Sequence, residues 1–215
     1  MGWNSNENDL ETLKTHAQKA LAKTLTEEVR KAAKGKIDVL TIGIDLIAND
    51  ESERHAELVA VCELASGYVF WTGKSYPTGA QERHLIQVVD LKTHLLKIAG
   101  EQVFVLGCHD LNMFSPRGRA NQKTKGRRWQ RCEETITLAK QFQPTIVLQH
   151  PHSTDSPNIW RTAWAGLIQE LPDVKAWASG IAYHHWDDQQ EPRGSLDEVL
   201  IATQGGMQTV DFIVS

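Results

Sequence analysis

The chain has few cysteines and no spacing that would pair them. Cys62, Cys108 and Cys132 are the three cysteines among 215 residues, and none belongs to a CxxC motif. An odd number of scattered cysteines argues against a disulfide framework and against a zinc ribbon. It favours a reducing compartment, so we expect a cytoplasmic protein.

Long apolar runs are also lacking. No stretch approaches the roughly 18 residues that a membrane span needs, and residues 1–36 are polar and charged. We therefore expect neither a membrane span nor a signal peptide. A net charge of -4 argues against binding of the whole chain to a polyanion. The length suits one domain over residues 1–215, with residues 1–8 flexible.

The remaining pattern is that of a mixed α/β chain. Apolar residues recur at helical spacing in three segments, which are residues 9–34, 127–142 and 157–171. Nearly continuous apolar runs predict strands. These runs are residues 37–47, a hairpin over 57–73, further strands over 85–107 with a turn near Ala99 and Gly100, and then 144–150, 174–183 and 198–215.

Polar side chains follow several of the predicted strands. The clusters are Cys108-His109-Asp110, His150-Pro151-His152 and Tyr183-His184-His185. Functional sites of α/β sheets collect at the carboxyl ends of strands. These clusters are therefore the first candidates for a site.

The stretch GEQVFVLGCHDLNMFSPR, residues 100–117, resembles the cysteine strand of the nitrilase, or carbon–nitrogen hydrolase, superfamily. In that family an apolar strand leads to Cys, one further residue, Asp or Glu, and then Phe/Pro and Arg. The matching positions here are Cys108, Asp110, Phe114, Pro116 and Arg117, with one residue more before the proline than is common.

The resemblance extends over roughly residues 10–215. The hairpin ELVAVCELASGYVFWTGKSYP ends at Lys74, Glu82 follows eight residues later, and Cys108 follows Lys74 by 34 residues. Residues 143–171 resemble the strand, loop and helix that follow the family's cysteine. The order and the spacing together carry the similarity.

This resemblance implies a nitrilase-like α-β-β-α sandwich with mixed sheets that associates at least as a homodimer. The family's first strands end in Pro-Glu, whose Glu is the general base. No apolar run precedes residue 9, so the domain is shortened at its amino end and that Glu is absent. Asp45, at the end of the first predicted strand, is a substitute by position.

Attack on an amide or nitrile carbon needs a nucleophile that is strong near neutral pH. The resemblance assigns this role to Cys108, with Lys74 favouring the thiolate and stabilising an oxyanion. Glu82 would hold the lysine in place. We therefore expect a thiol-dependent carbon–nitrogen hydrolase that needs no cofactor and acts on a small amide, carbamoyl or nitrile substrate, neutral or anionic.

Residues 117–131 hold seven basic residues and no acidic one. The segment would attract an anionic substrate, contact nucleic acid, or be a solvated loop; of these, nucleic acid is the least favoured. The expected substrate-binding residues are His109, Asn112, Arg117, His150 and His152.

Two other functions remain open. One is a catalytically degenerate protein that binds a ligand or partner. The other is a metal-dependent phosphohydrolase or nuclease, which would use the His/Asp clusters and the basic segment and would lose activity with a chelator. Its ligands would be His109 with Asp110, His150 with His152 and Asp155, and His184 with His185 and Asp187.

Overall fold

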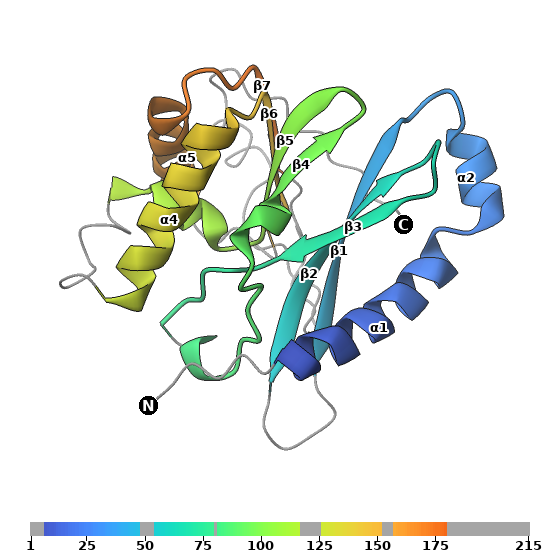
Figure 1. Cartoon of the computed structure of the whole chain (residues 1–215), viewed down its shortest axis with the longest axis horizontal. Coiled ribbons are helices and arrows are strands. Elements are labelled where there is room, and N and C mark those ends of the chain that lie inside the picture. Colours follow the sequence, from blue (N-terminus) through green and yellow to red (C-terminus); the bar gives the residue numbers. More distant parts are fainter. Residues whose placement is uncertain (1–6, 48–53, 80, 117–125, 152–156, 180–215) are drawn as a thin grey trace.

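The computed structural model describes residues 7–47, 54–79, 81–116, 126–151 and 157–179. Within these ranges the chain is a mixed α/β protein with two β-sheets and four α-helices (Figure 1). The predicted strand over residues 198–215 and the end of that over 174–183 lie outside the described residues, as do residues 1–6.

The first sheet is antiparallel and follows chain order. It contains β1 (Val39–Ile47), β2 (His55–Glu63) and β3 (Val69–Gly73). The turn between β2 and β3 includes Gly67 at φ 77°, a left-handed conformation that glycine adopts without strain. The predicted hairpin over residues 57–73 is therefore confirmed.

The second sheet is mixed and lies beside the first. Its order is β4 (Leu95–Ile98), β5 (Glu101–Leu106), β6 (Ile146–Gln149) and β7 (Ala176–Ser179). Strands β4 and β5 pair antiparallel through the predicted turn at Ala99 and Gly100, both left-handed, whereas β5, β6 and β7 run parallel. The carboxyl ends of the three parallel strands therefore meet at one edge.

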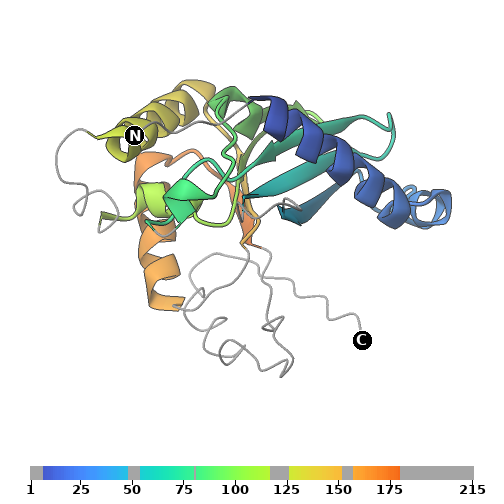
Figure 2. The same ribbon diagram turned by 90° about the horizontal axis from the view of Figure 1, so that it is seen from below.

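Helices cover the outer faces of both sheets (Figures 1 and 2). Leu13, Ala17 and Leu21 of α1 (Glu7–Thr24) bury themselves against apolar side chains of β2. The helix predicted over residues 9–34 is two helices, because Thr26 accepts a hydrogen bond from the Val29 amide and caps α2 (Glu27–Ala33). The other face carries α4 (Arg127–Phe142) and α5 (Pro157–Glu170). Short 3₁₀ helices span Gln81–Arg83, Leu91–His94 and Asp110–Phe114.

The two sheets share an apolar core between their inner faces. Val59 and Val61 of β2 pack in one cluster with Val103 and Val105 of β5 and with Leu96 of β4. The layers thus follow the order helix, sheet, sheet, helix. The arrangement confirms a mixed α/β protein with two sheets; the nitrilase-like fold and its shortening at the amino end stay predictions.

In the ranges described, no helix has both the length and the apolar character to cross a lipid bilayer.

Candidate functional site

Three charged residues form a row across the first sheet. Asp45 of β1 pairs in register with Glu57 of β2, and the Lys74 amide donates 2.8 Å to the Glu57 carbonyl just after β3 ends. Residues opposite one another in register point to the same face. That face is the inner one, because Glu57 alternates in phase with Val59 and Val61 of the inter-sheet core.

Lys74 and Glu57 form a buried ion pair. The Lys74 Nζ lies 2.7 Å from Glu57 Oε1, and their side chains are 2% and 8% exposed. Gln81 Nε2 donates to the same oxygen at 3.1 Å, and His55 Nε2 lies 3.8 Å from it. A buried ammonium requires such a partner, since an unpaired charge there would be strongly destabilising. Glu57 is therefore the counter-charge that pairs with Lys74 inside the protein.

Gly107, the residue before Cys108, lies in close contact with the backbone of Lys74. A Cβ on Gly107 would lie 2.7 Å from Lys74 Cα and 2.8 Å from Lys74 N, so only glycine permits this approach. Cys108 is half-buried, and its carbonyl accepts a hydrogen bond from Gln149 Nε2 at 3.1 Å. Ser179 Oγ donates to Gln149 Oε1 at 2.7 Å, which ties the ends of the parallel strands together.

Asp110 joins the lysine segment to the cysteine loop. Its Oδ1 accepts from Ser75 N at 3.0 Å, Ser75 Oγ at 3.2 Å and Tyr76 N at 2.7 Å, and its Oδ2 accepts from Gly107 N at 2.9 Å. The side chain is fully buried. Four donors occupy this carboxylate, so it acts as a structural clamp that fixes Lys74 relative to Cys108.

His109 is held as a neutral imidazole next to Cys108. Its ring stacks on Tyr76 with centroids 5.7 Å apart and planes 9° apart, and Asn112 Nδ2 lies 2.8 Å from its Nδ1. Burial, reinforced by the charges of Lys74 and Arg128, lowers the pKa of His109 to about 4. The ring is thus a poor proton acceptor at neutral pH.

His150 follows β6 and lies close to Gly43 of β1. Its amide donates to the Leu106 carbonyl at 2.9 Å, and a Cβ on Gly43 of β1 would lie 3.7 Å from its Nδ1. Burial lowers its pKa to about 4. A second neutral imidazole therefore sits between β1 and the carboxyl end of β6.

The structure brings together several residues predicted from the sequence and separates one. Lys74, Cys108, His109 and His150 lie near the strand ends, with Asn112 beside His109. Asp45 is exposed within the charged row. Glu82 lies in the 3₁₀ helix Gln81–Arg83 and its Oε1 is 3.6 Å from Arg128 Nη1, whereas the ion pair of Lys74 is with Glu57. Arg117 and His152 lie outside the described residues.

Sequence analysis missed Glu57, and a signal for it was available. It lies within the apolar strand HAELVAVCE, away from the strand end where Glu63 lies, and a carboxylate in such a position is rarely buried unless it is paired. Once the turn at Gly67 sets the hairpin register, Glu57 falls opposite Lys74. The register and the lysine together identify the pair.

The metal interpretation finds no support in the part of the chain that the structure describes. No group of three or more His, Cys, Asp or Glu side chains there could hold a metal ion. The carboxylate of Asp110 already accepts four hydrogen bonds from protein donors. The remaining proposed ligands, His152, Asp155, His184, His185 and Asp187, lie outside the described ranges.

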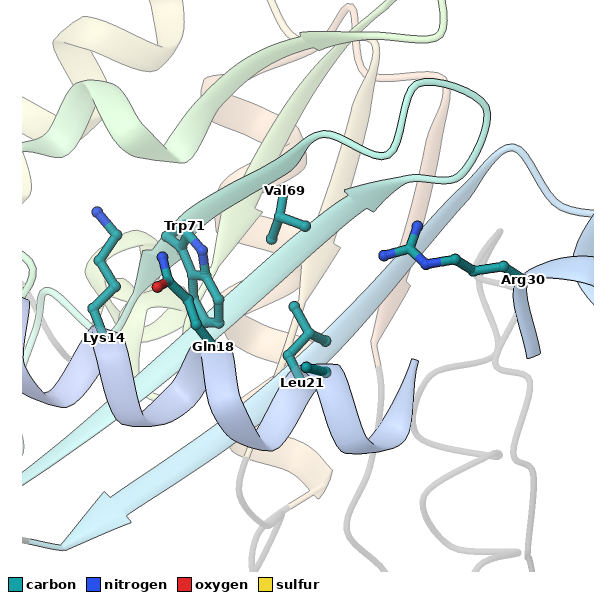
Figure 3. Close-up of a pocket in the computed structure, with 7 residues that line it drawn as sticks. Lys14, Gln18, Leu21, Arg30, Val69 and Trp71 are labelled. Carbon is teal, nitrogen blue, oxygen red and sulfur yellow. The ribbon is translucent and has the colours of Figure 1, made fainter. Parts of the chain in front are cut away.

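A separate hollow of about 480 Å³ lies on the other side of the first sheet (Figure 3). Lys14, Gln18 and Leu21 of α1 line it with Arg30, Val69 and Trp71. Val69 and Trp71 belong to the outer face of the sheet, packed toward α1. The hollow is therefore distinct from the site around Cys108.

Comparison of the chain with models of known protein families gives no match, and comparisons with curated proteins and with solved structures give none either.

Proposed function

We propose that the chain is a thiol-dependent carbon–nitrogen hydrolase that acts on a small amide, carbamoyl or nitrile substrate. The observation that carries the proposal is the buried Lys74–Glu57 ion pair, whose lysine lies on a backbone segment in close contact with Gly107, the residue before Cys108. In the proposal, the ammonium of Lys74 acts on the half-buried thiol of Cys108 and favours its thiolate. The same charge favours a developing oxyanion.

For an amide, the Cys108 sulfur attacks the carbonyl carbon and forms an S–C bond. Lys74 and the backbone N–H of His109 stabilise the tetrahedral oxyanion. The proton from the thiol passes to the leaving nitrogen, and ammonia departs as the C–N bond breaks. Water then cleaves the thioester, which releases the acid and restores the thiol.

The proposal gives each of three carboxylates a separate role. Glu57 holds Lys74, which is the role expected of Glu82 from the sequence. Asp45 lies next to Glu57 in the row and is exposed, so it is the candidate general base that takes the thiol proton and later activates water. Glu82 holds Arg128 at the edge of the site.

The proposal includes a nitrilase-like fold shortened at its amino end. It also includes a cytoplasmic location, a homo-oligomer and activity without a cofactor. Contact with nucleic acid through residues 117–131 is not part of it.

A degenerate ligand-binding protein is the second candidate. The observation that favours it is that the buried carboxylates already accept hydrogen bonds from protein donors. Asp110 accepts four hydrogen bonds, and Glu57 Oε1 is shared by Lys74 and Gln81. If Asp45 does not act as a base, the site would bind a ligand without turning it over.

A trapping experiment separates these functions. The protein is incubated with a panel of small amides, carbamoyl compounds and nitriles, and ammonia release is measured beside the intact mass of the protein. We expect ammonia release and an acyl adduct on Cys108 in the wild type, and neither in Cys108→Ala. Turnover that persists in Cys108→Ala would refute the proposal, and inhibition by a chelator would favour the metal interpretation.

A further inference from the structure

Arg128, in the first turn of α4, is linked to Cys108 through stacked rings. Its guanidinium carbon lies 4.7 Å from the centroid of the Tyr76 ring. Tyr76 in turn stacks on His109, the residue after Cys108, with centroids 5.7 Å apart. A cation thus packs on an aromatic platform that extends to His109, the residue next to the candidate nucleophile.

This platform is rigid. The Tyr76 side chain is 1% exposed, and its amide donates to Asp110 Oδ1 at 2.7 Å. The other oxygen of Asp110 accepts from Gly107 N in the cysteine loop. The same carboxylate therefore fixes both the support of Arg128 and the loop that carries Cys108.

The guanidinium still has donors to offer. Its side chain is 31% exposed, and its contact with Glu82 at 3.6 Å is longer than the roughly 2.7–2.9 Å of a bidentate pair. Its Nε is buried and has no hydrogen-bond partner among the described residues, so the exposed part of the side chain is what a ligand would meet. Arg131, one turn later, differs because its Nη1 donates to the Val89 carbonyl at 2.8 Å.

The charge of Arg128 acts electrostatically on His109 at the site. Together with burial and the charge of Lys74, it lowers the pKa of the neighbouring His109. Two fixed cations therefore act on His109, the residue next to Cys108. Lys74 is held by a buried carboxylate at 2.7 Å, whereas Arg128 is partly exposed and lies 3.6 Å from Glu82, so Arg128 is the more open of the two to a ligand.

We propose that Arg128 is a substrate-binding residue that selects substrates that carry a carboxylate group. The inference rests on the proposed function, since it deepens the substrate class of the same site. The planar fork of a guanidinium matches a carboxylate in two parallel hydrogen bonds. Glu82 acts as a weak internal competitor that occupies Arg128 until a substrate carboxylate displaces it.

Two alkylating reagents of matched size test this inference without a known substrate. Iodoacetate carries a carboxylate and iodoacetamide is neutral, and both transfer a two-carbon group to a thiolate. Peptide mass spectrometry follows the rate of modification at Cys108 alone. The other two cysteines, Cys62 and Cys132, are buried. The quantity measured is the ratio of the iodoacetate rate to the iodoacetamide rate at low salt.

In Arg128→Gln, we expect this ratio to fall by roughly 3- to 10-fold from the wild-type value. Arg127→Gln is the matched control, since it removes the same charge from an exposed neighbour and should leave the ratio near that of the wild type. Glu82→Gln should raise the ratio, because it removes the competing carboxylate. Misfolding would not produce this opposite sign.

An equal fall of the rate ratio in Arg127→Gln and Arg128→Gln would overturn the inference. It would show that the ratio depends on the total positive charge of the segment and not on Arg128 in particular. An unchanged ratio in both Arg128→Gln and Glu82→Gln would also overturn it. Failure of the proposed function gives a different result. An unactivated thiol slows both reagents together, and the ratio still reports on Arg128.

Discussion

The ammonium of Lys74 and the carboxylate of Glu57 lie 2.7 Å apart, and both come from one β-hairpin. The hairpin register places them opposite each other on the inner face of the first sheet. Asp45 extends the row on β1. Two carboxylates on neighbouring strands repel each other, so Lys74 stabilises the fold as well as the proposed thiolate.

Replacing Glu57 by Gln should destabilise the protein strongly. The change leaves the Lys74 ammonium buried without a counter-charge, and we expect a loss of roughly 3 kcal/mol in the free energy of unfolding. Urea denaturation measures it. The double variant Lys74→Met/Glu57→Gln should recover much of the loss because no buried charge remains.

The matched control is an exposed pair. Glu27 and Lys31 are 75% and 74% exposed and 3.0 Å apart, so Glu27→Gln should change stability little. Equal effects of the Glu57 and Glu27 substitutions would contradict a buried ion pair.

Asp110→Asn should loosen the link between the lysine segment and the cysteine loop. An amide has one acceptor oxygen, so its NH₂ group would face either the Gly107 amide or those of Ser75 and Tyr76. We expect a loss on the order of 3 kcal/mol in the free energy of unfolding, measured in urea. A stability equal to that of the wild type would show that the clamp contributes nothing.

Gly107→Ala should separate the cysteine loop from Lys74. A Cβ there would lie 2.7 Å from Lys74 Cα, and backbone atoms on both sides must shift. We expect a cost of roughly 2 kcal/mol in stability and slower alkylation of Cys108 by iodoacetamide. Gly79→Ala is the control because a Cβ there meets no atom within 4 Å. Tolerance of alanine at both positions would argue against the close approach.

The neutral histidines predict a loss of stability in mild acid. Burial lowers the pKa of His109 and of His150 from 6.5 to about 4, so between these values the unfolded chain binds more protons than the folded one. The stabilisation is complete above about pH 6.5 and is lost as the pH falls toward 4. Each histidine contributes about 2 kcal/mol of this loss between pH 7.5 and pH 5.

His109→Phe isolates one of these contributions while keeping a ring against Tyr76. Urea denaturation of the wild type and the variant at pH 7.5 and pH 5 gives the comparison. The variant should lose less stability than the wild type on acidification, by about 2 kcal/mol. Identical losses would mean that His109 titrates alike in the folded and unfolded chains.

Local structure could be predicted from the sequence where a single local feature, such as a turn residue, determines it. The turn at Ala99 and Gly100 and the hairpin through Gly67 follow from residues that tolerate left-handed backbone. The helix expected over residues 9–34 was too long, because apolar spacing continues across Leu25 while the Thr26 cap restarts the helix.

The site was only partly predictable because its partners come from different strands. Cys108 and Lys74 were predicted from their own segments, and this assignment stays a prediction. Glu57, however, becomes the partner of Lys74 only through the hairpin register, and Glu82 was favoured because it is nearer in sequence. The four bonds to Asp110 depend on how two loops meet between the sheets, which spacing along the chain does not encode.

The most direct test of the account is the pH dependence of Cys108 alkylation by iodoacetamide, compared between the wild type and Lys74→Ala. Peptide mass spectrometry restricts the measurement to Cys108. The account predicts that the wild-type rate reaches half of its maximum well below pH 8.5, the value for a free cysteine, and that the profile moves upward without Lys74. A profile centred near pH 8.5 in both proteins, or a Cys108 that does not react, would contradict a working cysteine–lysine pair.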